Sequence, residues 1–204
     1  KKIKIKQADA KYLPFNEEIS AIILAASHGP EFLDLTKDKP KTMVEINGKP
    51  ILDYIKSTLL SSGIKKISVV GGYKYESINL DNINLIGNDR WKDTGNVFSL
   101  KLAKENLEGT TIISNGDLVF EKSILNQLIE TPGDIVLLVD SSQIIKDRDF
   151  NFWVKGVTPP SDEYGSPGWC SLENITYGKE QDSDAQWTSI MKVSPVGSSI
   201  LKQN

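Results

Sequence analysis

The sequence predicts an α/β fold: a Rossmann-like, mostly parallel sheet with helices on both faces and a small antiparallel β appendage. Short apolar runs alternate with helical patterns over residues 19–140, which is typical of a parallel sheet covered on both sides. The first run, residues 19–26, is typical of a strand buried on both faces. Polar, glycine-bearing segments follow the strands, at the sheet edge where such folds bind ligands. These segments are 27–41, 71–76, 88–96 and 115–117.

The predicted elements follow from that first strand. Residues 1–18 are lysine-rich and then polar, and we interpret them as a linker or N-terminal arm before a domain over 19–204. A long loop is predicted over 27–42. A helix is predicted over 50–62, because Pro50 suits a first turn and Gly63 suits the end. Further strands are predicted at 67–70, 83–86, 110–114 and 135–139, and further helices at 96–106 and 121–130.

The pattern weakens after residue 140. Residues 156–168 are rich in proline, glycine and serine, which predicts an irregular loop. Residues 171–177 and 186–193 are predicted to be strands, which we interpret as an antiparallel pair. A short helix is predicted from Ser194-Pro195 to Gln203. This part forms the expected β appendage.

Composition excludes several classes of function. The 204 residues carry a formal net charge of -3, so there is no global positive field to hold nucleic acid. No apolar run approaches the roughly 20 residues of a membrane span, and no signal peptide is visible. The single cysteine, Cys170, makes no internal disulfide and fits a reducing compartment. We therefore expect a cytoplasmic protein that binds neither nucleic acid nor membrane.

The loop after the first strand has the composition of a phosphate-binding segment. Its small residues allow backbone N–H groups to approach a polyphosphate, and Lys37, Lys39 and Lys41 can meet the negative charge. A surface loop with solvated lysines is the alternative. The segment is neither a P-loop nor a dinucleotide fingerprint, because the required Gly-Lys-Ser/Thr and three-glycine patterns are missing.

Several motifs together resemble a known family. They are the strand at 21–26, Lys39-Pro40-Lys41, the segment 44–52, Gly72-Tyr73-Lys74-Tyr75-Glu76, Asn88-Asp89-Arg90-Trp91, and Thr94-Gly95-Asn96-Val97-Phe98-Ser99-Leu100. These residues resemble the sugar-nucleotide and phosphocholine nucleotidyltransferases. The last group is most similar to the cytidylyltransferase domains that are joined to phosphoenolpyruvate phosphomutases. The resemblance is good over 19–140 and loose over 141–204.

Two departures from the family pattern concern phosphate and metal binding. Glu31 stands where the family usually has an arginine, and Ser27 stands where it usually has the first loop glycine. The family often has a late aspartate after a tryptophan as a second metal ligand. The chain reaches Asn204 without such a segment, so one interpretation is that a C-terminal segment of the domain lies outside this sequence. Asp184 is the substitute ligand, with an ordinary loop carboxylate as the alternative.

The resemblance implies catalytic roles for Lys41 and Asp117. Asp117 follows a buried strand, and its carboxylate suits Mg²⁺, which prefers hard oxygen ligands and phosphates. Lys41 is expected to stabilise the charge that builds up during attack on the α-phosphorus. A structural turn aspartate and a solvated lysine are the respective alternatives.

The resemblance also implies two binding sets. The expected nucleotide contacts are Leu24, Ala25, Ala26, Ser27, His28, Gly29, Gly72, Tyr73, Thr94, Gly95, Asn96 and Ser99. The expected acceptor contacts are Tyr73, Glu76, Trp91, Lys146 and Arg148. The alternatives are an exposed loop residue for His28, an N-cap for Asn96, core packing for Trp91, and a solvated turn for 146–148.

The function implied by the resemblance is transfer of CMP from CTP to a small phosphonate, such as 2-aminoethylphosphonate or 2-hydroxyethylphosphonate, with release of pyrophosphate. The cofactor is Mg²⁺, and the expected partner is a phosphoenolpyruvate phosphomutase, fused or separate, in phosphonate biosynthesis. Three alternatives are a phosphocholine cytidylyltransferase, a sugar-1-phosphate nucleotidyltransferase, and a non-catalytic nucleotide-binding module.

Overall fold

The computed structural model describes residues 18–141, 151–157, 171–178 and 184–203. The chain divides into two compact units. The first unit comprises Lys1–Val136 and Met191–Asn204, and the second comprises Leu137–Ile190. Almost all of the expected N-terminal linker, together with Lys146 and Arg148, lies outside the described residues.

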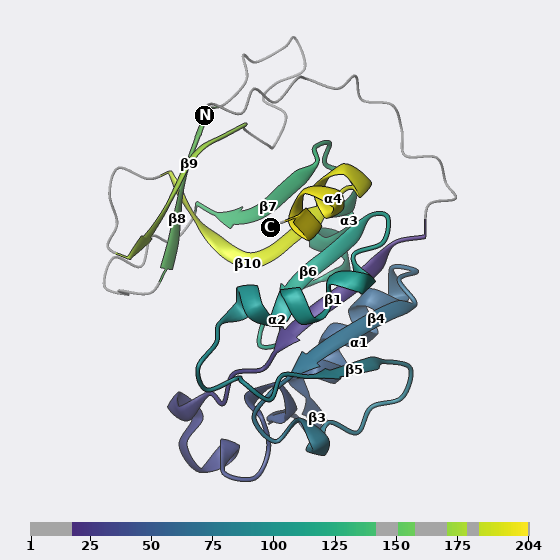
Figure 1. Ribbon diagram of the computed structural model, residues 1–204, viewed down its shortest axis with the longest axis vertical. Helices are drawn as coiled ribbons and strands as arrows, with labels where there is room; N and C mark the ends of the chain where they lie inside the picture. The colour runs from purple at the N-terminus through teal and green to yellow at the C-terminus, as the bar shows by residue number, and fades with distance from the viewer. Residues whose placement is uncertain (1–17, 142–150, 158–170, 179–183, 204) are drawn as a thin grey trace. The chain divides into compact units, whose positions relative to one another are not determined.

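The first unit is built on a parallel sheet (Figure 1). Its strands lie in the order β5 (Asn84–Gly87), β4 (Lys66–Gly71), β1 (Ser20–Ala25) and β6 (Thr111–Asn115). All three neighbouring pairs are parallel. β1 is almost entirely buried, as expected for a strand flanked on both sides and covered on both faces. Since parallel strands share a direction, their carboxyl ends meet at one edge of this sheet.

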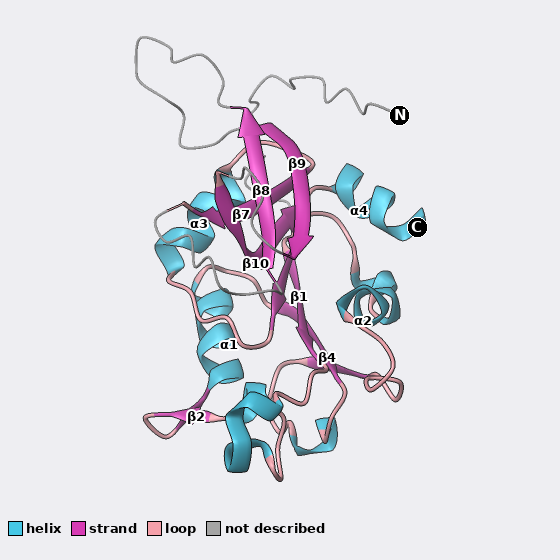
Figure 2. Ribbon diagram, turned by 90° about the vertical axis from the view of Figure 1, so that its left-hand side faces the viewer, coloured by secondary structure: helices cyan, strands magenta, loops and turns pink. Residues whose placement is uncertain are grey.

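Helices cover both faces of this sheet. They are α1 (Ile51–Ser61), α2 (Asn96–Leu102), α3 (Lys122–Glu130) and α4 (Pro195–Gln203). Figure 2 shows α1 and α3 on one side of the strands and α2 and α4 on the other. On the α2 and α4 side, one apolar cluster joins Ile22, Val70 and Ile113 of the sheet to Leu201 of α4. The predicted α/β fold class is confirmed.

The segment between β1 and α1 differs from the predicted loop. It contains two short 3-10 helices, Pro30–Thr36 and Lys41–Met43, and a two-strand hairpin of β2 (Glu45–Ile46) and β3 (Lys49–Pro50). Asn47 and Gly48 turn this hairpin with φ values of 52° and 74°, the positive angles that an Asn-Gly type I′ turn requires. The predicted long loop over 27–42 thus contains 3-10 helices that the sequence did not predict, because such short turns carry no hydrophobic period.

A buried lysine closes the far end of α3. Lys192 is 4% exposed, and its ammonium donates hydrogen bonds to the carbonyl oxygens of Ile129, at 3.0 Å, and Thr131. These carbonyls stand at the C-terminal end of a helix, where backbone acceptors lack partners and a cation is favourable. Burial lowers the pKa of Lys192 below its ordinary value, because desolvation penalises the charged form.

The second unit contains an antiparallel arrangement. β8 (Asn151–Val157) pairs antiparallel with β9 (Ser171–Gly178) and with β10 (Ala185–Val193), and β7 (Ile135–Asp140) pairs with β10. β7 and β10 each run from one unit into the other. The predicted antiparallel appendage is confirmed, but its two predicted strands are not direct partners. β8, which the sequence pattern did not predict, lies between them.

Candidate nucleotide-binding and catalytic site

The loop after β1 bends around the Lys41 side chain. Gly29 is buried and has φ 72°. A β-carbon at Gly29 would lie 2.6 Å from the β-carbon of Lys41, so both the backbone angle and the close approach require glycine. The Thr36 hydroxyl donates a hydrogen bond of 3.1 Å to the Gly29 carbonyl and fixes the loop. The small residues of this loop thus bring backbone close to Lys41.

Lys41 and Asp117 meet across the ends of two loops. The Lys41 Nζ lies 2.7 Å from the Asp117 Oδ2, and the two side chains are 17% and 32% exposed. Asp117 follows β6, whereas Lys41 begins the second 3-10 helix after β1. The structure therefore brings together the two residues for which the sequence predicts catalytic roles. Partial burial allows this charge pair to act more strongly than a surface pair.

Glu31 is a third member of this charge cluster. Its Oε1 lies 3.7 Å from the Lys41 Nζ, and its side chain is 60% exposed. From the sequence, Glu31 was notable only because it stands where the family usually has an arginine. Its contact with Lys41 depends on the 3-10 helix of Pro30–Thr36, which that pattern does not predict.

The turn before Asp117 is tightly packed. A β-carbon at Gly116 would lie 2.7 Å from the Ala25 β-carbon and 3.1 Å from the Thr42 hydroxyl oxygen. Thr42 is fully buried, and its hydroxyl has no hydrogen-bond partner among the described residues. The backbone N–H of Gly116 donates to the Leu24 carbonyl at 2.8 Å. This packing fixes the position of Asp117 relative to the end of β1.

Three aromatic rings gather at the carboxyl ends of β1, β4 and β5. The ring centroids of His28 and Tyr73 are 3.9 Å apart, those of Tyr73 and Trp91 are 5.3 Å apart, and those of His28 and Trp91 are 6.2 Å apart. All three rings are half-buried. The predicted nucleotide contact His28 and the predicted acceptor contacts Tyr73 and Trp91 therefore form one aromatic cluster.

The β4 loop is joined to the β1 loop by backbone and side-chain contacts. Tyr73 donates its N–H to the Ala26 carbonyl at 3.2 Å and its hydroxyl to the Lys37 carbonyl at 2.8 Å. A β-carbon at Gly72 would lie 2.5 Å from the Ala26 oxygen and 2.5 Å from the Trp91 β-carbon. Only glycine fits at this contact. The two loops thus form one framework around the aromatic cluster.

Asn88 organises the segment that leads to α2, and the sequence pattern did not single it out as a site residue. Its side chain is 1% exposed, and its amide donates to the hydroxyls of Thr94 and Ser99, both at 3.1 Å. Its oxygen accepts from the Arg90 N–H at 3.0 Å. Ser99 is itself buried at 1% exposure. The contact of Ser99 with Asn88 is structural. Recognition of a nucleobase by the Ser99 hydroxyl stays a prediction.

Asn96 is the first residue of α2, and the N-cap is Gly95, so the N-cap alternative for Asn96 was wrong. The Asn96 amide donates to the Asn115 side-chain oxygen at 3.1 Å. Asn115 ends β6, two residues before Asp117. This second contact missed by the sequence pattern joins the Thr94–Asn96 region to the Asp117 turn.

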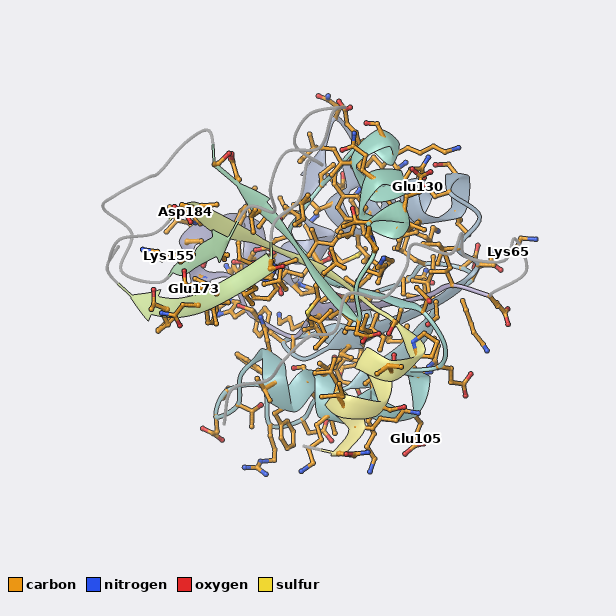
Figure 3. All side chains as sticks on the ribbon, turned by 90° about the horizontal axis from the view of Figure 1, so that it is seen from above. Lys65, Glu105, Glu130, Lys155, Glu173 and Asp184 are labelled. Atoms are coloured by element: carbon orange, nitrogen blue, oxygen red, sulfur yellow. The ribbon has the colours of Figure 1, made fainter. Side chains whose placement is uncertain are left out.

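In the first unit, Lys37, Lys39 and Glu76 are not members of this charge cluster. Lys39 pairs with Glu45 at 3.3 Å, and Lys37 contributes its carbonyl to Tyr73, so the three loop lysines do not share one contact. Glu76 is exposed. Asp184 belongs to the second unit, where it is exposed and accepts a hydrogen bond from the Gly156 N–H at 3.0 Å. Figure 3 shows its side chain in the same region of that unit as Lys155 and Glu173.

The fold and this site define a nucleotidyltransferase class of protein, and comparison with known proteins agrees. Residues 21–160 match the model of the MobA-like NTP transferase domain. The chain belongs to that family, and the predicted superfamily is confirmed.

The curated relatives include cytidylyltransferases. A CTP:phosphoglutamine cytidylyltransferase of Campylobacter jejuni is 29% identical over 191 residues, which cover 86% of this chain and 73% of the relative. A choline-phosphate cytidylyltransferase of Streptococcus pneumoniae is 32% identical over 114 residues, 54% of this chain and 50% of that protein. A 2-aminoethylphosphonate cytidylyltransferase of Lancefieldella rimae is 34% identical, over 50% of this chain and 44% of that protein.

Solved structures share the fold. The CTP:phosphocholine cytidylyltransferase of Streptococcus pneumoniae superimposes with a TM-score of 0.62 and 23% identity over 91% of this chain and 75% of that chain. An inositol-1-phosphate CTP transferase of T. maritima gives a TM-score of 0.68 and 20% identity, over 91% of this chain and 74% of that one.

No helix in the described ranges is long and apolar enough to cross a membrane.

Proposed function

We propose that this chain is a cytidylyltransferase that transfers CMP from CTP to a small phosphonate, such as 2-aminoethylphosphonate or 2-hydroxyethylphosphonate. The observation that carries the proposal is the contact of 2.7 Å between Lys41 and Asp117, beside a glycine-bearing loop at the carboxyl edge of a parallel sheet. The similarity to three cytidylyltransferases supports CTP as the donor.

The reaction is an in-line displacement at the α-phosphorus. A phosphonate oxygen of the acceptor forms a bond to this phosphorus while the bond to the bridging oxygen of the pyrophosphate breaks, and the electron pair leaves with pyrophosphate. The acceptor oxygen is already anionic at neutral pH, so no general base is required. Lys41 stabilises the charge on the non-bridging α-phosphate oxygens, and the loop backbone positions the triphosphate.

A magnesium ion fits the donor atoms at this site. Asp117 offers a partly exposed carboxylate of the hard-oxygen type that Mg²⁺ prefers. Among the described residues, no group of three or more His, Cys, Asp or Glu side chains gathers to hold a metal. This suits Mg²⁺ at nucleotide sites, which usually takes one or two carboxylates together with phosphate oxygens and waters. When bound, the ion would neutralise phosphate charge.

The aromatic cluster is the proposed recognition site. His28, Tyr73 and Trp91 offer ring faces and edges within a few ångströms of one another, and such surfaces accommodate a nucleobase or the ammonium of an aminoalkyl acceptor. Glu76 follows Tyr73 by three residues in the sequence, and its carboxylate is exposed. Discrimination between pyrimidines would come from polar groups of the Gly72 and Thr94–Ser99 segments, because a mismatched base leaves such groups unpaired.

A phosphorylated acceptor is the second candidate. A curated relative aligned over 86% of this chain is named for phosphoglutamine, not for a phosphonate, and another is named for choline phosphate. The proposed mechanism applies equally to a phosphate oxygen. The chemistry therefore extends to these acceptors without a change in the role of Lys41 or Asp117.

The proposal is tested by measuring kcat/KM for CTP and UTP with 2-aminoethylphosphonate, 2-hydroxyethylphosphonate, phosphocholine, phosphoglutamine and glucose 1-phosphate. We expect CTP with a phosphonate to be preferred. Preference for phosphocholine or phosphoglutamine would change the acceptor alone. Preference for UTP with glucose 1-phosphate would overturn the cytidylyltransferase assignment, and tight CTP binding without turnover of any pair would favour a non-catalytic nucleotide-binding module.

A further inference from the structure

Lys41 is shared between two carboxylates. Its Nζ lies 2.7 Å from Asp117 Oδ2 and 3.7 Å from Glu31 Oε1. Its side chain is 17% exposed, whereas those of Asp117 and Glu31 are 32% and 60% exposed. The three groups together carry a formal charge of one negative unit, and the cation expected to bind phosphate is already neutralised.

A metal-free triphosphate entering this site would compete with both carboxylates for Lys41. It would also place several negative charges near two more, which is unfavourable at the intermediate effective dielectric of a partly buried site. A divalent cation held by Asp117 would reverse the sign of this balance, because it would add two positive units. Lys41 is then free to turn from Asp117 toward a phosphate.

We propose that Glu31 makes the site selective for the divalent-cation complex of the nucleotide over the free nucleotide. Glu31 acts as a competitor for Lys41 that is displaced when the cation and the triphosphate enter together. Its high exposure, 60%, allows the carboxylate to move into solvent at little cost. Glu31 is a specificity-determining residue and touches no reacting atom. The inference rests on the proposed function, because it takes an NTP as the ligand.

The test compares nucleotide binding, not turnover. The dissociation constant of CTP is measured by calorimetry at low ionic strength for the wild type, Glu31→Gln and Glu31→Asp, in excess chelator and in saturating Mg²⁺. Glu45→Gln is the matched control, because Glu45 is also an exposed glutamate that pairs with a loop lysine, Lys39, at 3.3 Å. Thermal unfolding of each variant confirms that it is folded.

We expect Glu31→Gln to tighten metal-free CTP binding by roughly two- to fivefold, the scale of an incompletely screened charge contact, and to change Mg²⁺-CTP binding by less than about twofold. Glu31→Asp and Glu45→Gln should keep the wild-type ratio of the two constants. An unchanged ratio in Glu31→Gln would overturn the inference. Weaker Mg²⁺-CTP binding in Glu31→Gln, with metal-free binding unchanged, would overturn it in favour of a direct cation ligand.

The outcome also separates this inference from the proposed function. If the wild type binds no CTP even in saturating Mg²⁺, the proposed function fails and the inference fails with it. If the wild type binds Mg²⁺-CTP and only the ratio for Glu31→Gln is unchanged, the proposed function stands and the role of Glu31 alone is contradicted.

Discussion

Lys41 joins the two halves of the candidate site at the scale of single residues. Its aliphatic chain packs on Gly29 of the β1 loop, and its ammonium reaches Asp117 beyond β6. A lysine has several rotatable bonds, so packing of its aliphatic part is what limits the positions of its charge. The loop glycine and the Lys41 ammonium therefore depend on each other, and a change at either residue should affect the same function.

Replacement of Lys41 by alanine should lower kcat by at least about a hundredfold, the scale of losing one preorganised charge contact in a transition state. Steady-state kinetics of the purified variant checks this. Lys101→Ala is a suitable control, because Lys101 is an exposed lysine on α2. Near wild-type turnover in Lys41→Ala would show that another group stabilises the α-phosphate.

Replacement of Asp117 by asparagine should remove most activity and shift the dependence on Mg²⁺ to higher concentration. A neutral amide oxygen is a weaker ligand for Mg²⁺ than a carboxylate, so excess metal should restore part of the rate. Titration of activity against Mg²⁺ for both proteins checks this. Full activity of the wild type in excess chelator would contradict the role given to Asp117.

At the scale of elements, regular hydrophobic patterns predicted well and irregular segments did not. The helix predicted at 50–62 is α1, and its buried residues Leu52, Ile55 and Leu59 follow the helical period. β8 escaped prediction for a physical reason. A register shift between Lys155 and Gly156 interrupts its pairing with β9, and an irregularity of this kind breaks the two-residue alternation by which strands are recognised.

The end of α3 gives a stability prediction. Lys192→Met should lower the free energy of unfolding by roughly 1–3 kcal/mol near pH 7, because two helix-end carbonyls lose their donor. Lys202→Met, at an exposed position of α4, should change it by less than about 0.5 kcal/mol. Chemical denaturation of the three proteins checks both values. An equal effect at the two positions would contradict the capping role of Lys192.

The same lysine predicts a pH dependence. Because burial lowers the folded-state pKa of Lys192, the unfolded chain holds this proton more tightly. Stability therefore rises with pH between the lowered folded pKa and the ordinary unfolded value. The advantage of the wild type over Lys192→Met should grow as the pH approaches 10.5, the ordinary value. A difference that shrinks over this range would contradict the lowered pKa.

Because the β1 and β4 loops are in close contact at Gly72, a single methyl group added there should affect both stability and binding. Gly72→Ala would place a β-carbon 2.5 Å from both the Ala26 oxygen and the Trp91 β-carbon, so the loops must separate. We expect a loss of roughly 1–3 kcal/mol in stability together with weaker CTP binding. Gly95→Ala is the steric control for stability, because its β-carbon would meet no atom within 4 Å. Equal melting temperatures for the two variants would contradict this packing.

At the scale of the whole molecule, the sequence predicted the class of site better than its contacts. Alternating strands and helices place the loops after β1, β4 and β6 at one edge, which is why Lys41 and Asp117 could be expected to meet. The hydrogen bonds of Asn88 and the Asn96–Asn115 contact could not be predicted, because they depend on side-chain directions in irregular turns. The contact of Glu31 with Lys41 could not be predicted for the same reason. The net charge of -3 gives no overall attraction for an anionic substrate, so local charges must provide it.

The most direct measurement is ³¹P NMR of a mixture of the protein, CTP, Mg²⁺ and 2-aminoethylphosphonate, repeated with phosphocholine and phosphoglutamine. We expect pyrophosphate and a new CMP adduct, joined to the acceptor through a P–O–P linkage, to appear in equal amounts with at least one acceptor. Neither product should form in excess chelator or with Lys41→Ala at comparable times. Unchanged CTP with every acceptor, or release of free CMP without an adduct, would contradict the assignment of nucleotidyl transfer.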